Sequence, residues 1–189
     1  LGTVTILYVA DNHAQLMPLY FREPSVNLGV GADKGLPPHL TDAEFRKYFN
    51  IAAGSADAYA LTADDFVSLA RNYGRMGGMD RVAALINAVR AERGEDKVLL
   101  LDGGDTWQGS WTSLQTKAQD MIDVMSALKV DAMVGHWEFT YGADRVKEVA
   151  DKAPFAFLAQ NVRDNEWQEP VFEPRKMFEK GGAKIAVIG

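Results

Sequence analysis

Short apolar runs rich in β-branched residues alternate along this chain with segments of helical period. The runs cover residues 4–10, 98–101, 132–134, 155–158 and 185–188. Apolar residues spaced i, i+3, i+4, i+7 predict helices ending at Gly74 and Gly94, a third helix over residues 121–128 and a shorter one over 143–150. This alternation is typical of an α/β fold. We therefore expect strands buried on both faces in a sheet that is parallel at least in part, with each helix laying an apolar stripe on it.

Residues 18–61 interrupt the alternation with a poorly patterned, glycine- and proline-containing stretch. We interpret it as an insertion with a functional or mobile role. Thr41 and Glu44 fit a capping box for a short helix, and Thr62 before two aspartates predicts the N-cap of the helix that ends at Gly74. The aromatic residues of the stretch either line a substrate slot or form a small satellite core: Tyr20, Phe21, Phe45, Tyr48, Phe49 and Tyr59.

The composition excludes several classes of site. The 189 residues include no cysteine, which rules out disulfides, iron–sulfur clusters and a cysteine nucleophile. With only three histidines, a metal site must depend on carboxylates or on ligands from outside the chain. The net charge of -6 argues against broad nucleic-acid binding. No apolar stretch of about 20 residues predicts a membrane span, and no secretory signal precedes the first strand, so we expect a trimmed start.

Residues able to bind metals follow the predicted strands. Asp11 and His13 follow the first strand, Asp105 the second, His136 the third and Asn161 the fourth. Open α/β sheets place ligand sites at the carboxyl ends of their strands, because the connecting loops diverge there. These positions therefore predict a shared metal site, since carboxylates and imidazoles suit manganese, iron or zinc.

Local spacing supports that site but leaves structural alternatives open. Asp11 and His13 are two apart, so an extended backbone would point both side chains the same way. Gly103 and Gly104 permit a tight turn that brings Asp105 close to an ion. Each cluster taken alone could be an ordinary loop. We expect Asp102 to be a turn or capping acid and His39 to be an exposed loop residue.

The three clusters resemble, in order, the Asp-x-His, Gly-Asp and Gly-Asn-His-Glu motifs of the 5′-nucleotidase branch of the calcineurin-like metallophosphoesterases. Asp11 with His13, Gly104-Asp105, and Gly135 with Glu138 carry the match. The resemblance implies the N-terminal part of a four-layer α/β/β/α sandwich. The centre of the third motif differs, because His136-Trp137 stands in place of Asn-His. Trp137 offers one N–H donor and cannot act as an acid or base, which argues against ordinary phosphomonoesterase chemistry.

Gly-His-Trp-Glu-Phe-Thr-Tyr-Gly at 135–142 is similar to a narrower family, the SoxB thiosulfohydrolases of the periplasmic sulfur-oxidation system. Residues 22–29, 74–78 and 105–110 are similar to it as well. The resemblance implies a periplasmic, dinuclear-metal hydrolase, with two divalent ions expected to be Mn²⁺. It would release sulfate from a cysteine S-thiosulfonate on a SoxYZ carrier protein by attack of a metal-bound hydroxide.

By the same resemblance, the first metal is held by Asp11, His13 and Asp105, with Asp105 bridging to a second metal held by His136. Trp137 and Asn161 are candidate catalytic residues, although Asn161 could instead only tie down its own loop. Arg22 and Arg75 are candidates for contacts with an anionic substrate, with surface ion pairs as the alternative. The stretch 18–61 is the candidate carrier channel.

The resemblance also implies that residues 1–189 are the N-terminal portion of a larger catalytic domain, with further metal-binding histidines and a C-terminal domain outside this chain. We therefore expect the chain alone to bind metal weakly and to be inactive. Two alternatives stay open. One is a 5′-nucleotidase-type metallophosphoesterase, and the other is a non-catalytic binding module on a degenerate scaffold.

Overall fold

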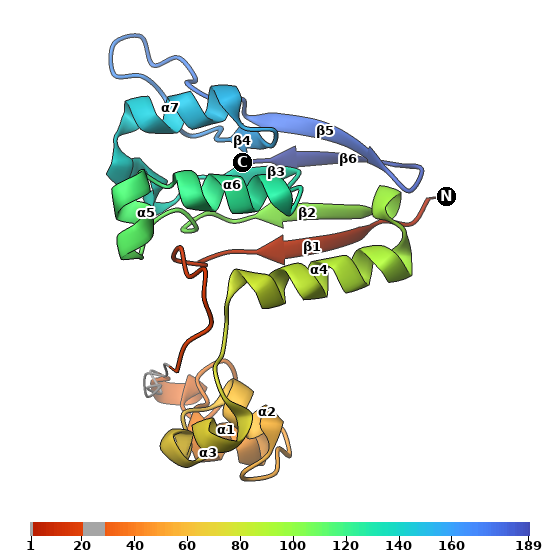
Figure 1. Ribbon diagram of the computed structural model, residues 1–189, viewed down its shortest axis with the longest axis vertical. Helices are drawn as coiled ribbons and strands as arrows, with labels where there is room; N and C mark the ends of the chain where they lie inside the picture. Colours follow the sequence, from red (N-terminus) through yellow and green to blue (C-terminus); the bar gives the residue numbers. More distant parts are fainter. Residues whose placement is uncertain (1, 21–28) are drawn as a thin grey trace. The chain divides into compact units, whose positions relative to one another are not determined.

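The computed structural model describes residues 2–20 and 29–189 and divides into two compact units (Figure 1). The first unit comprises Leu1–Met17 and Met79–Gly189, and the second comprises Pro18–Gly78. The second unit thus contains the poorly patterned stretch and continues past it to Gly78. Arg22 and Phe21 lie outside the described residues.

A four-stranded parallel sheet forms the centre of the first unit, in the order β1-β2-β3-β4. Its strands are β1 (Thr5–Val9), β2 (Val98–Asp102), β3 (Ala132–Val134) and β4 (Ala156–Leu158). The expected α/β class, with a parallel sheet, is confirmed. Val9 lies opposite Asp102 in the register, so the loops after β1 and β2 leave the sheet side by side.

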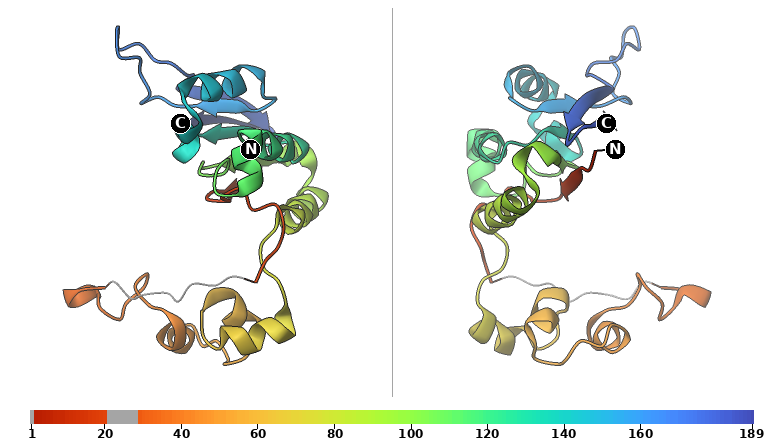
Figure 2. Two further views of the ribbon diagram at one scale, coloured as in Figure 1. Left: turned by 60° about the vertical axis from the view of Figure 1, so that its left-hand side comes forward. Right: turned by 90° about the vertical axis from the view of Figure 1, so that its right-hand side faces the viewer.

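Three longer helices, α4 (Met79–Arg93), α6 (Gln119–Ala127) and α7 (Ala143–Lys152), lie along one face of this sheet (Figures 1 and 2). The short helix α5 (Trp111–Thr116) precedes α6. All were predicted except α5. The core combines residues from the helices, from this face of the sheet and from the loop after β2: Ile86, Leu100, Trp107, Met121, Met125, Met133, Val146 and Phe157.

The expectation of burial on both faces holds for β2, where Leu99 and Leu100 point to opposite faces and are both fully buried. It fails for the edge strand β1, whose Ile6 and Tyr8 are 53% and 67% exposed. Within α4, Ile86 is buried as predicted, whereas Leu85 is 70% exposed. Leu85 lies one residue, about 100° of helix rotation, away from the face that packs on the sheet.

Residues 185–188 do not extend the parallel sheet. They belong to β6 (Ala183–Ile188), which pairs in antiparallel fashion with β5 (Arg175–Lys180). β5 has no apolar pattern that would predict a strand, because its residues are mostly charged. Gly181 and Gly182 form the turn with φ of 55° and 78°, and a Gly-Gly pair between two strands is a hairpin signal that could have revealed it.

The second unit contains α1 (Asp42–Tyr48), α2 (Ala56–Leu61) and α3 (Phe66–Tyr73), so the stretch 18–61 is not structureless. Short 3-10 turns cover Gly31–Asp33 in this unit, and Glu95–Lys97 and Trp137–Tyr141 in the first. The helix after Thr41 begins as predicted, but the Thr41 side chain makes no capping hydrogen bond.

The prediction for Thr62 was wrong. Thr62 ends α2 and its hydroxyl donates to the Ala58 carbonyl oxygen at 2.7 Å, while Asp65 stands at the N-cap of α3. The stripe of α3 stacks on α2 inside the second unit, because the buried ring of Tyr59 lies against Phe66 and Tyr73. Of the two alternatives for the aromatic residues, Tyr59 therefore fits a small satellite core.

The other residues predicted in the second unit lie differently. Tyr20, Tyr48 and Phe49 remain exposed. His39 is half-buried rather than exposed, since the loop at Gly29 lies close to its side chain. No helix in the described part of the chain is long and apolar enough to cross a membrane.

Candidate metal centre

The loop after β1 reaches the candidate site through a left-handed backbone. Asp11 and His13 have φ of 55° and 48°, so the expected extended arrangement was wrong. The loop is held instead by backbone hydrogen bonds to the loop after β2, from Asp11 N to Gly104 O at 2.9 Å and from His13 N to Asp105 O at 3.1 Å. Such left-handed residues each cost about 1–3 kcal/mol and persist where surrounding contacts enforce them.

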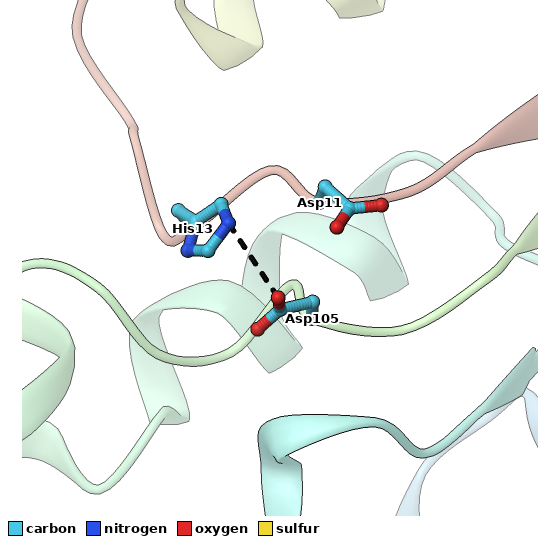
Figure 3. Close-up of side chains that lie close together, drawn as sticks. All are labelled: Asp11, His13 and Asp105. Atoms are coloured by element: carbon cyan, nitrogen blue, oxygen red, sulfur yellow. Dashed lines mark ion pairs between the residues drawn. The ribbon is translucent and has the colours of Figure 1, made fainter. Parts of the chain in front are cut away.

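Asp11, His13 and Asp105 converge. Each offers one possible ligand atom, and these three atoms lie within 4.8 Å of one another (Figure 3). The Nε2 atom of His13 lies 3.5 Å from Oδ2 of Asp105. The Asp105 side chain is only 8% exposed, whereas that of His13 is 53% exposed. The cluster therefore combines a buried carboxylate, that of Asp105, with a solvent-accessible imidazole, that of His13.

His136, in the loop after β3, approaches the same carboxylate oxygen. Its Nδ1 atom lies 3.3 Å from Oδ2 of Asp105. That single oxygen therefore lies between imidazoles from two different strand-end loops. An oxygen in this position is suited to bridge two cations, because carboxylates can share one donor between neighbouring ions.

Glu138, which belongs to the third motif, joins the loops after β2 and β3. Its carboxylate is fully buried and accepts backbone hydrogen bonds from Asp105, Thr106, Trp107 and His136, at 2.7–3.2 Å. Because these donors come from the loops after β2 and β3, Glu138 fixes Asp105 relative to His136. The signal in the sequence was a lone glutamate placed among apolar and aromatic residues.

Asp102 organises the turn that carries Asp105, as expected of a turn acid. It accepts from the Gly104 amide at 2.8 Å and from the Thr106 hydroxyl at 2.9 and 3.0 Å. Burial of this carboxyl raises its pKa to about 7, although the hydrogen bonds from Gly104 and Thr106 oppose that shift.

Two glycines allow the loops to approach so closely. Gly104 has a φ of 86°, and a Cβ there would lie 2.8 Å from the Val134 carbonyl oxygen. Gly109 has a φ of 127°, and a Cβ there would lie 2.5 Å from the His13 carbonyl oxygen. A side chain at either position would push apart loops that carry candidate ligands.

The remaining candidates lie as follows. Trp137 is 57% exposed, beside His136 and not in the core. Asn161 is exposed in the turn after β4, and among the described residues no hydrogen bond or ion pair joins it to the cluster. Arg75 belongs to the second unit, where its guanidinium lies 5.5 Å from the Tyr20 ring centre. The roles assigned to these residues stay predictions.

The donor set fits divalent transition metals. Carboxylate oxygens and imidazole nitrogens, with no thiolate available, are the donors that manganese, iron and zinc accept. Asp11, His13 and Asp105 can hold one ion, and Asp105 Oδ2 with His136 can contribute to a second.

The chain is similar to 5′-nucleotidases and to a sulfate thiohydrolase. A 5′-nucleotidase of Vibrio vulnificus is 38% identical over 115 residues, which cover 59% of this chain and 21% of the nucleotidase. The solved structure of the sulfate thiohydrolase SoxB of Thermus thermophilus aligns with this chain over its whole length, with 35% sequence identity and a TM-score of 0.85. The aligned part is 35% of the SoxB chain. A 5′-nucleotidase precursor structure from the same organism matches with a TM-score of 0.60 and 23% identity, over 98% of this chain and 28% of its own.

No protein-family model matches the chain. The chain spans about a fifth of the nucleotidase and about a third of the SoxB structure. Its parallel sheet and helices match the N-terminal domain of these proteins. The chain is thus similar in sequence to part of the 5′-nucleotidases, and in sequence and fold to part of the sulfate thiohydrolase SoxB.

Proposed function

We propose that the protein is a dinuclear-metal hydrolase that releases sulfate from a cysteine S-thiosulfonate on a SoxYZ-type carrier protein in the periplasm. The observation that carries the hydrolase assignment is the position of Asp105 Oδ2 between His13 and His136. Similarity to the sulfate thiohydrolase SoxB over the whole chain supports the sulfur substrate.

The proposed ligands are Asp11, His13 and Asp105 for the first ion and Asp105 with His136 for the second, with manganese as the expected metal. When bound, two such ions supply a water of lowered pKa and neutralise charge on the reacting oxyanion. The chain's own contribution is to fix the shared carboxylate, which Glu138 does by holding the backbone of Asp105 and His136.

The surroundings of the cluster support a substrate carried on a polypeptide. A cleft of about 410 Å³ is lined only by uncharged residues: Gln108, Gly109, Ser110, Trp111, Leu114, Thr140 and Tyr141. Trp111 and Leu114 in this cleft are 74% and 62% exposed. An uncharged, partly apolar cleft suits a peptide segment better than it suits a multiply charged phosphate ester.

Trp137 supports the choice of sulfonate over phosphate. A thiosulfonate resembles a phosphoryl group in shape but carries less charge, so it requires less cationic assistance. An indole at this position excludes the proton-donating role that a histidine could take. We place Asn161, Arg22 and Arg75 in the same proposal as candidate contacts, and the stretch 18–61 as the candidate carrier channel.

The test compares two substrates on the protein at its full native length, loaded with Mn²⁺. Sulfate release from a peptide cysteine S-thiosulfonate and phosphate release from AMP are measured as kcat/KM. The proposal expects turnover of the thiosulfonate and little or none of AMP, and Asp105→Asn should abolish turnover. Trp137→His should lower thiosulfonate turnover and raise hydrolysis of phosphate esters. If that variant changes neither, the argument from Trp137 fails.

A 5′-nucleotidase is the second candidate, favoured by the curated relatives. Preferential turnover of AMP would establish it in place of the thiosulfohydrolase. Absence of turnover on both substrates, in protein shown to contain metal, would instead favour a non-catalytic binding module.

A further inference from the structure

The two oxygens of the Asp105 carboxylate face different partners. Oδ2 lies 3.5 Å from His13 Nε2 and 3.3 Å from His136 Nδ1. Oδ1 accepts a hydrogen bond from the side-chain amide of Gln108. Because an ionised carboxylate only accepts, the amide atom facing Oδ1 is the nitrogen, Nε2. One oxygen is thus occupied by a neutral donor while the other is left to the imidazoles.

The backbone of Asp105 does not by itself decide this orientation. Its N–H donates to Glu138 and its carbonyl accepts from the His13 amide, which fixes the main chain. The torsion that turns the carboxylate about its Cβ–Cγ bond remains, and torsions of this type are broad. Among the described residues, Gln108 is the side chain that donates a hydrogen bond to this carboxylate.

Gln108 is itself held in place by its neighbours in the chain. Trp107 is fully buried, and its carbonyl oxygen accepts from the hydroxyls of Ser113 and Tyr141. On the other side, Gly109 lies against the main chain of His13. The amide therefore reaches Oδ1 from a backbone position that is fixed on both sides.

The chemistry of an amide suits this place. A lysine or arginine could donate the same hydrogen bond, but its positive charge would repel cations held by the same carboxylate. A neutral amide orients the carboxylate without that repulsion. We infer that Gln108 is a positioning residue that turns Oδ2 of Asp105 toward both metal positions. This inference rests on the proposed metal centre.

The test replaces Gln108 with methionine, which keeps the length of the side chain and removes the donor. Gln115→Met makes the same change on the exposed surface of α5 and serves as the control. Mn²⁺ binding is measured by isothermal titration calorimetry, and the Co²⁺ d–d spectrum reports the ligand geometry. Loss of a hydrogen bond that orients a metal ligand weakens binding by about 10–100-fold, so we expect this for Gln108→Met and no change for the control.

Crystal structures of the metal-free wild type and of Gln108→Met provide a readout that requires no metal. The inference expects Oδ2 of Asp105 to turn away from at least one imidazole in the variant, while the urea midpoint stays that of the wild type. Gln108→Ala removes the same donor and should behave alike if the methionine variant misfolds. An unchanged carboxylate orientation together with unchanged Mn²⁺ affinity would overturn the inference. Failure of the wild type to bind Mn²⁺ would instead contradict the proposed function, and the crystal structures would still decide what Gln108 orients.

Discussion

Replacing Glu138 by glutamine tests how the candidate centre is held together. The two carboxylate oxygens of Glu138 accept four backbone hydrogen bonds in a fully buried position. In Glu138→Gln, one oxygen becomes an NH₂ group, which faces backbone N–H donors and cannot accept from them. Thr106 and Trp107 donate to one oxygen, and Asp105 and His136 donate to the other, so either orientation of the amide leaves a pair unsatisfied.

The expected loss of stability follows from the two backbone N–H groups that are left without an acceptor. A hydrogen bond to a charged group contributes about 1.5–3 kcal/mol, so losing two costs about 3–6 kcal/mol. The variant no longer buries a charge, which offsets part of this loss. We expect the free energy of unfolding to fall by about 3 kcal/mol.

Urea unfolding of the metal-free protein, followed by circular dichroism, measures this change. Glu166→Gln makes the same substitution at an exposed position and should stay within about 0.5 kcal/mol of wild type. Mn²⁺ affinity of the folded Glu138→Gln protein should also fall, because Asp105 and His136 lose their common anchor. A variant as stable as wild type, with unchanged metal affinity, would refute the reasoning.

Three further predictions concern the same loops. Because burial raises the pKa of Asp102 from 3.8 to about 7, the folded state holds its proton more tightly. The free energy of unfolding of the metal-free protein should therefore decrease by up to about 4 kcal/mol as the pH rises from about 4 to about 7, and Asp102→Asn should remove this slope in urea titrations. Gly109→Ala should destabilise more than Gly54→Ala in the same measurement, since both have positive φ but only the former brings a Cβ against the His13 carbonyl; equal losses would exclude the steric explanation. Mn²⁺ at about 100 times its dissociation constant should stabilise the wild type by about 2.7 kcal/mol, measured by thermal unfolding, and should not stabilise Asp105→Asn.

The succession of strands and helices along the chain, and the loops that carry the site, could be predicted from the sequence. Apolar runs separated by helices imply a parallel sheet, and a parallel sheet gathers its carboxyl ends at one edge. Asp11, His13, Asp105 and His136 are found at that edge, and their possible ligand atoms lie near one another. The backbone that brings Asp11 and His13 there is left-handed, because it follows hydrogen bonds to the loop after β2 that local spacing does not reveal.

Other features depend on contacts between distant parts of the chain. The role of Glu138 depends on backbone N–H donors up to 33 residues away in the sequence. No local sequence pattern reveals such contacts. Thr62 followed by aspartates had the composition of a helix start, but its hydroxyl is bonded to the preceding turn of α2. Ile6 is exposed whereas its register partner Leu99 is fully buried, because β1 lies at the edge of the sheet and β2 lies inside it; a run of apolar residues does not reveal that difference.

The most direct test of the proposed metal centre is anomalous diffraction from crystals of the protein soaked in Mn²⁺. We predict a manganese peak ligated by Asp11, His13 and Asp105, and a second ion, where present, sharing Oδ2 of Asp105 with His136. Manganese bound at other residues, or no peak at this cluster in crystals that leave it accessible, would contradict the proposed metal centre.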